Sequence, residues 1–172
     1  MDKGSSFVGI DVSKGTLQMA ALYAGREGFV EWDVVHEAAA VRRMVRKVKR
    51  EAGGPVVFCY EAGPCGFVLQ RQIKALGCKC IVVAPSLIPV KPGERIKTDP
   101  RDARNLAKLL RAGLLTEVHP PTVEEEAVRD LVRCREDLVE DAARCRHRLS
   151  KMLLRRGYVW RPGRQWTVAH RH

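Results

Sequence analysis

The sequence lacks several features that would define a protein class at once. It has no apolar run that approaches the length of a membrane span, and residues 1–6 show no signal-peptide pattern. No two of its six cysteines have the Cys-x-x-Cys spacing of a zinc site, and no pair of histidines could complete one. We therefore expect a globular cytoplasmic protein with reduced, mostly buried cysteines and no membrane partner.

Acidic residues are also scarce compared with basic ones. The 172 residues include 31 Lys or Arg but only 20 Asp or Glu, which gives a formal net charge of +11 at pH 7. Such an excess favours a polyanionic partner, and nucleic acid before a membrane surface. The length is enough for one domain with a real core and a helical appendage.

The first third of the chain predicts three strands. Residues 7–12, 17–23 and 29–35 are short runs rich in branched residues and separated by turns, which is typical of an antiparallel meander. In the first run, alternation places Gly9 and Asp11 on the same face. Aspartate is disfavoured inside strands, so Asp11 is a candidate for a functional residue.

Residues 38–52 predict a helix with an apolar stripe and a strongly basic opposite face. A run of charge on a helix is usually a solvated surface. The absence of acids among these bases keeps a second interpretation open, in which this face contacts phosphates. The candidate nucleic-acid-binding residues of this helix are Arg42, Arg43, Arg46, Lys47 and Arg50.

The middle of the chain predicts two parallel strands. Residues 56–60 form a continuous apolar run that Glu61 ends, Pro64 begins a second helix, and residues 79–83 form the next strand. A strand, a helix and a strand within about 30 residues imply a right-handed parallel crossover. We therefore expect an α/β fold with a mixed five-stranded sheet and flanking helices.

A basic loop is predicted over residues 86–96, followed by a helix that runs from Pro100 to about Ala112. Asp99 is expected to be the N-cap of this helix, and Asp102 lies on the side that should face the core. An acid directed at a core needs a partner, although Asp102 could instead only favour the positive helix end. Further candidate nucleic-acid-binding residues in this stretch are Lys91, Arg95, Lys97, Arg101 and Arg104.

The last predicted helix is long, from about residue 123 to residue 156, and Thr122 with Glu125 forms a capping box at its start. Its apolar residues alternate three and four apart, in a heptad seam that only Arg135 interrupts. A helix of this length needs a partner helix, most simply from a second copy of the chain. The seam consists of Val128, Leu131, Arg135, Leu138, Ala142, Cys145, Leu149 and Met152.

Four acids are expected to meet at one end of the sheet. Asp11 lies on the first strand and Glu61 at the end of the fourth, and these two strands should be neighbours. Asp99 and Asp102 open the helix that follows the fifth strand. Four carboxylates in one pocket cannot all stay ionised unaided, and Mg²⁺ or Mn²⁺ would resolve this conflict. Paired ions could then clamp the attacking and leaving oxygens of a phosphodiester.

Each of these acids also has a purely structural interpretation. Asp11 could form a hydrogen bond with the turn at residues 13–14, and Glu61 could pair with a base such as Lys14. Asp99 and Asp102 could act only as helix-capping residues.

Three short segments carry the candidate acids: residues 9–14 (GIDVSK), 60–64 (YEAGP) and 97–104 (KTDPRDAR). Together they resemble the DEDD transposases of bacterial insertion sequences, the family that includes Piv-type DNA invertases and bridge-RNA-guided recombinases. Their order, spacing and flanking residues all match. The resemblance implies a RuvC-like, RNase H-type fold and a catalytic metal bound by Asp11, Glu61, Asp99 and Asp102.

The resemblance also implies an organisation and an activity. We expect a RuvC-like catalytic domain over residues 1–118, a dimerising coiled-coil helix over residues 119–157, and a linker over residues 158–172 that leads into a further, serine-bearing domain. The expected function is metal-dependent DNA cleavage and strand transfer by a transposase or site-specific recombinase. The expected partners are DNA, a guide RNA and further copies of the chain in a dimer or tetramer.

Two other classes remain open at this point. Residues 9–16 also resemble the first phosphate loop of actin-like ATPases, but that class needs a second lobe and leaves Asp99 and Asp102 unexplained. A non-catalytic, basic, dimerising nucleic-acid-binding module would explain the charge and the heptads. It would leave the four acids without a purpose.

Overall fold

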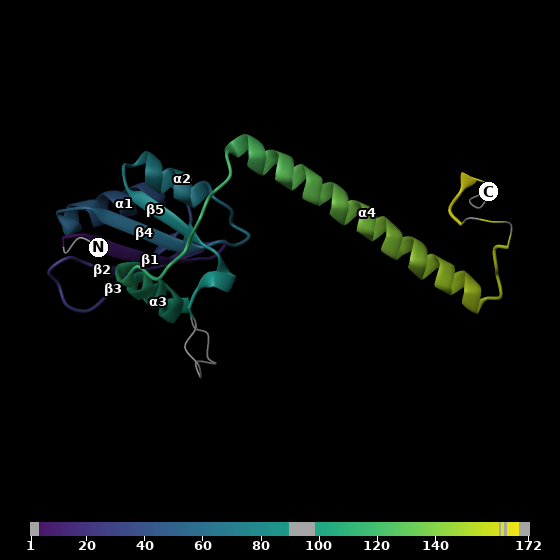
Figure 1. Ribbon diagram of the computed structural model, residues 1–172, viewed down its shortest axis with the longest axis horizontal. Helices are drawn as coiled ribbons and strands as arrows, with labels where there is room; N and C mark the ends of the chain where they lie inside the picture. Colours follow the sequence, from purple (N-terminus) through teal and green to yellow (C-terminus); the bar gives the residue numbers. More distant parts are fainter. Residues whose placement is uncertain (1–3, 90–98, 162, 164, 169–172) are drawn as a thin grey trace. The chain divides into compact units, whose positions relative to one another are not determined.

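A six-stranded mixed β-sheet forms the centre of the amino-terminal part of the protein (Figure 1). The computed structural model describes residues 4–89, 99–161, 163 and 165–168, with residues 99–101 described only through their backbone. The chain divides into two compact units, Met1–Pro120 and Pro121–His172. The sheet and three of the four α-helices belong to the first unit.

The sheet has the strand order β3-β2-β1-β4-β5-β6. The first three strands form the predicted antiparallel meander, and β4 and β5 follow in parallel with β1, as expected for the crossover. The predicted number of five strands is wrong, because a two-residue strand in the expected connector pairs antiparallel with β5. The bounds are β1 Ser6–Val12, β2 Thr16–Leu22, β3 Val30–Val35, β4 Val56–Glu61, β5 Lys79–Val83 and β6 Glu117–Val118.

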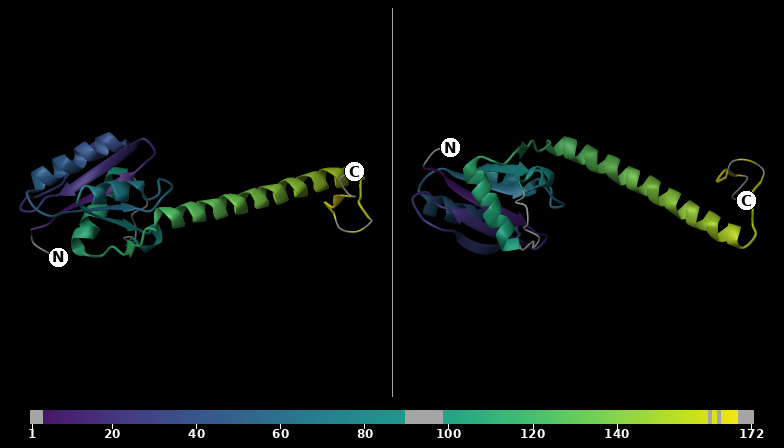
Figure 2. Two further views of the ribbon diagram at one scale, coloured as in Figure 1. Left: turned by 90° about the horizontal axis from the view of Figure 1, so that it is seen from above. Right: turned by 60° about the horizontal axis from the view of Figure 1, so that its bottom comes forward.

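Helices cover both faces of the sheet (Figure 2). Helices α1 (Ala38–Ala52) and α2 (Val68–Ala75) pack on one face, and α3 (Asp99–Ala112) packs on the other. A short 3₁₀ helix, Pro85–Leu87, follows β5. The fold class is therefore mixed α/β with three layers.

Helix α2 begins four residues later than predicted. Pro64 does not open it, because the segment from residue 64 to residue 67 forms turns instead. The amide of Gly66 donates to the carbonyl oxygen of Gly63 at 3.1 Å, and Gly66 has a left-handed φ of 63°. A left-handed residue cannot continue a right-handed helix, so the first regular turn starts only after it.

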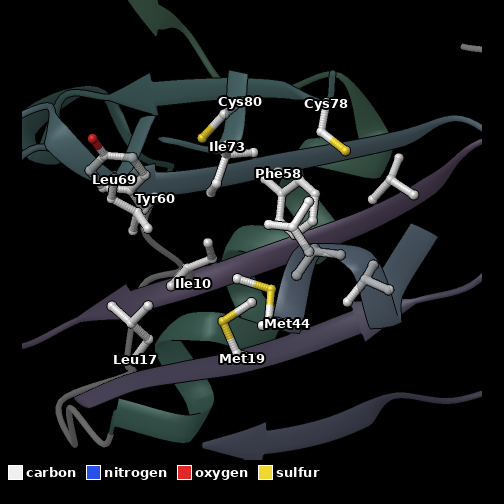
Figure 3. Packing of buried hydrophobic residues seen from close by; sticks show 14 of the residues in the cluster. Ile10, Leu17, Met19, Met44, Phe58, Tyr60, Leu69, Ile73, Cys78 and Cys80 are labelled. Carbon is white, nitrogen blue, oxygen red and sulfur yellow. The ribbon is translucent and has the colours of Figure 1, made fainter. Parts of the chain in front are cut away.

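The larger apolar cluster lies between the sheet and helices α1 and α2 (Figure 3). The aromatic rings of Phe58 and Tyr60 from β4 are buried in this cluster, together with Met44 of α1 and Ile73 of α2. Burial of this kind is the main favourable term in folding. The apolar stripe predicted for the helix over residues 38–52 is confirmed as part of this core.

All six cysteines are free thiols. Cys59, Cys78 and Cys80 are buried in or next to the sheet, and burial raises the pKa of the Cys80 thiol to about 12. These thiols stay protonated at neutral pH because burial disfavours the thiolate. Cys134 and Cys145 differ from the expectation of burial, since both are exposed.

The second unit is dominated by helix α4 (Val123–Arg155). Its predicted capping box is confirmed: the Glu125 amide donates to the Thr122 hydroxyl, and the Thr122 amide donates to the Glu125 carboxylate. No residue of α4 is buried. None of the helices in the described residues combines the length and apolar character that crossing a membrane requires.

Candidate active site

Two of the four candidate acids lie on neighbouring parallel strands. The register of β1 and β4 pairs Gly9 with Cys59 and Ile10 with Tyr60, so Asp11 and Glu61 come next to each other. Side chains two residues apart on a strand share a face, so both acids lie on the face of Gly9 and Cys59. Cys59 packs with residues of α3, which identifies this as the α3 face of the sheet. Asp11 and Glu61 are both half-buried.

Helix α3 lies unusually close to this face. A Cβ atom on Gly9 would come within 2.1 Å of the carbonyl oxygen of Ala103 and 2.7 Å of the amide nitrogen of Ala107. Only a residue without a side chain allows two backbones to approach this closely. Gly9 therefore sets the distance between α3 and β1.

The direction of α3 brings its first turn toward Asp11. Gly9 contacts Ala103 and Leu106, and Phe7, earlier on β1, packs in the same cluster as Leu110. The helix therefore runs opposite to β1, with its amino-terminal end toward the end of the strand. Asp102 lies one turn before buried Leu106 and is half-buried, as predicted for the side that faces the core.

The fold thus directs Asp11, Glu61 and Asp102 to the same edge and the same face of the sheet. Among the side chains that the structure describes, no three His, Cys, Asp or Glu residues are grouped closely enough to hold a metal ion. The side chain of Asp99 lies outside the described residues, although its backbone opens α3. The predicted four-acid metal site therefore stays a prediction.

The structural alternative for Glu61 is not what the structure contains. Within the described residues, Glu61 forms no ion pair with Lys14. In the turn after β1, the Ser13 hydroxyl donates to the carbonyl oxygen of Thr16 at 2.8 Å, and a ring nitrogen of His36 lies 2.9 Å from the carbonyl oxygen of Ser13.

An ion pair that the sequence did not predict ties α3 to the third strand. Nε of Arg104 donates to the Glu31 carboxylate at 2.5 Å, and a second guanidinium N–H donates to the other carboxylate oxygen. These hydrogen bonds lower the pKa of Glu31 and raise the pKa of Arg104. Arg104 was a predicted nucleic-acid contact, and in this structure its guanidinium is occupied by Glu31. The two residues are 73 positions apart, so no local pattern could reveal the pair.

The basic face of α1 lies on the opposite side of the sheet from the three acids. Arg42, Arg43, Arg46 and Arg50 are exposed, and none of their guanidinium groups forms an ion pair or a hydrogen bond within the described part of the chain. Lys47 differs, because it lies 3.9 Å from Glu51 and its ammonium group is 5.6 Å from the centre of the Trp32 ring. Lys91, Arg95, Lys97 and the side chain of Arg101 lie outside the described residues.

Comparison with known proteins decides the family. The model of the IS110-type DEDD transposase family, described as a transposase, matches residues 8–156. The chain belongs to this transposase family. The matched region includes the three motif segments and the whole of α4.

Two curated relatives in this transposase family match nearly the whole chain. The y4qE protein of Sinorhizobium fredii is 45% identical over 171 residues, and the transposase for insertion sequence element IS1533 of Leptospira borgpetersenii is 40% identical over 171 residues. Each alignment covers 98% of this chain. The chain spans 44% of the length of the first relative and 49% of the length of the second.

Proposed function

We propose that this chain forms the RNase H-like (RuvC-like) catalytic part of a DNA transposase or site-specific recombinase of the DEDD type. The observation that carries the proposal is the convergence of Asp11, Glu61 and the first turn of α3 on one edge of the sheet. Membership of a transposase family gives these acids a substrate class, which is DNA.

A divalent cation fits the chemistry of the donor groups. Asp11, Glu61, Asp99 and Asp102 would offer hard carboxylate oxygens, which Mg²⁺ and Mn²⁺ prefer. When bound, such an ion would stabilise the charge that develops on a phosphodiester during cleavage. The protein's own contribution is to fix the three elements that carry the acids, through the β1–β4 register and the contact at Gly9.

The basic residues would hold the nucleic-acid backbone. The exposed arginines of α1 offer guanidinium groups for this purpose, and Lys91, Arg95, Lys97 and Arg101 are the further candidates from the sequence. Contacts of this kind release counterions and do not read sequence, so they support affinity and positioning.

Strand transfer and target selection are proposed for a longer protein, because the two relatives are about twice as long as this chain. We infer that strand transfer requires a further domain with a serine nucleophile, and that a guide RNA selects the DNA target. Helix α4 would join protomers into a homodimer, or a tetramer, through a coiled coil.

Calorimetric titration of Mn²⁺ or Mg²⁺ into the metal-free 172-residue chain tests the proposal. We expect binding in the wild type that weakens roughly tenfold or more in Asp11→Asn and in Asp102→Asn, since even indirect partners of ligands change affinity by that factor. Asp130→Asn on exposed α4 is the matched control, because it removes the same charge away from the sheet. Equal binding in all four proteins would refute the metal site.

A second function is favoured by the exposed arginines of α1 together with the unburied seam of α4. In this case the chain would be a non-catalytic, dimerising nucleic-acid-binding module. It would bind DNA equally well with EDTA present and would show no acid-dependent metal binding. The same titration therefore separates the two functions.

A further inference from the structure

Helix α4 carries a long, mostly apolar seam, and no residue of this helix is buried. The seam, defined above by its eight residues from Val128 to Met152, is exposed along its length, with Leu131 at 72% and Leu138 at 64%. Apolar residues at alternating three- and four-residue spacing are the pattern that packs knobs into holes against another helix. The seam therefore needs a partner helix.

The charges along α4 are segregated from one end to the other. The stretch 144–156 has no acid, and its bases are Arg144, Arg146, Arg148, Lys151, Arg155 and Arg156. The stretch 123–143 is acidic, with Glu124, Glu125, Glu126, Asp130, Glu136, Asp137, Glu140 and Asp141 against three arginines. A helix with opposite charge at its two ends is complementary to a reversed copy of itself.

We propose that two copies of this chain pair through α4 in antiparallel orientation, an inference that rests on the dimer of the proposed function. In this orientation the acidic end of each helix lies along the basic end of the other. Parallel pairing would bring the basic ends of both copies together, and like charges side by side are destabilising.

The seam itself is consistent with this orientation. When the two antiparallel helices cross at a point midway between Leu138 and Ala142, every seam residue of one copy lies opposite a seam residue of the other. Leu138 then faces Ala142, Arg135 faces Cys145, and a large side chain meets a small one in both layers. Parallel pairing would instead place Arg135 against Arg135 of the second copy, and two like charges at this distance repel each other.

One charge pair between the two copies would favour the parallel orientation, but its acid already forms an ion pair within its own helix. Parallel pairing would place Asp141 near Arg146 of the second copy. In the structure, Asp141 accepts a hydrogen bond from Arg144 at 2.5 Å, and Arg144 also contacts Glu140 at 3.3 Å. Arg144 therefore neutralises Asp141 within its own helix. The same ion pair reduces the repulsion between the two copies of Asp141, which lie near each other at the centre of an antiparallel pair.

Oxidative cross-linking tests the orientation. In a background with Cys65→Ser and Cys134→Ser, the substitution Arg135→Cys leaves two accessible thiols, at position 135 and at Cys145. We expect a disulfide between position 135 of one copy and Cys145 of the other, identified by mass spectrometry of the linked peptides. Disulfides require Cα atoms within about 7 Å, and two copies of Cys145 in the antiparallel pair would be about 15 Å apart along the axis.

The control is Glu136→Cys in the same background, which moves the thiol by one residue to an exposed position outside the seam. We expect roughly tenfold less covalent dimer from it, because its thiol points away from the partner. A second pair, Val128→Cys with Met152→Cys in a Cys145→Ser background, tests the two ends of the seam and leaves Arg135 in place.

The outcomes are distinct. Links between position 135 and itself, or between two copies of Cys145, overturn the antiparallel orientation and leave the dimer of the proposed function intact. A monomer in sedimentation experiments, with helical circular dichroism unchanged, overturns both. Metal binding by the acids would be unaffected by either result, so the catalytic part of the proposed function is tested separately.

Discussion

Replacing Gly9 with alanine inserts a methyl group at the place where α3 lies directly on β1. The new Cβ atom would be 2.1 Å from the Ala103 carbonyl oxygen and 2.7 Å from the Ala107 amide nitrogen. Both atoms belong to the helix backbone, so no side-chain rotation can relieve the overlap. The helix as a whole must move away from the sheet.

Overpacking of a core typically costs about 1–3 kcal/mol, and two backbone overlaps place Gly9→Ala at the upper end, about 3 kcal/mol. With a urea m-value of about 1.5 kcal/mol/M, the unfolding midpoint should fall by about 2 M. Urea unfolding followed by circular dichroism measures this change. Because α3 also carries Asp102, metal affinity should fall in the same variant while it is still folded.

Gly15→Ala is the matched control, since a Cβ atom there meets nothing within 4 Å and the residue lies in an exposed turn. Its free energy of unfolding should stay within about 0.5 kcal/mol of the wild type, as for most surface changes. If Gly9→Ala and Gly15→Ala are equally stable, the contact between α3 and β1 does not limit the packing, and the argument that Gly9 positions Asp102 is refuted.

Three other predictions follow from the described contacts. Arg104 lowers the pKa of Glu31, so the pair stabilises the folded state at pH values above the pKa of an unfolded glutamate. This stabilisation is lost as the pH falls through the lower pKa that Glu31 has in the folded state. Glu31→Gln should remove this pH dependence from unfolding curves measured between pH 3 and 6. Thr122→Ala should cost about 1 kcal/mol of helix stability and reduce the ellipticity at 222 nm. Arg42→Gln with Arg46→Gln should lower the slope of log K against log salt for duplex DNA by about 2, measured by fluorescence anisotropy, and an unchanged slope would exclude these arginines as phosphate contacts.

Residues that begin or end a helix or strand explain which elements could be predicted. The bounds of α1 were predicted correctly because Gly53 ends the helix with a left-handed φ of 60°. The start of α2 was missed because Pro64 is a common first helical residue, and only the conformation of Gly66 delays the helix. A two-residue strand such as β6 has too few side chains to show alternation, and only its pairing with β5 defines it.

The candidate site was predictable where topology determines it. A parallel crossover after a meander makes β1 and β4 neighbours, which places Asp11 beside Glu61. The close contact at Gly9 could have been suspected, because a glycine inside a strand often marks a close backbone approach. The pair of Arg104 with Glu31 could not, because it depends on where α3 crosses the sheet.

The three-layer arrangement limits how a nucleic acid can use this domain. The exposed arginines of α1 point outward from one face, while Asp11, Glu61 and Asp102 belong to the other. A straight duplex lying along α1 cannot also reach the acids of the same domain, since the sheet lies between them. In the proposed function, the α1 arginines and the acids of one protomer therefore contact separate segments of nucleic acid. The alternative is a single nucleic acid that bends around the edge of the sheet.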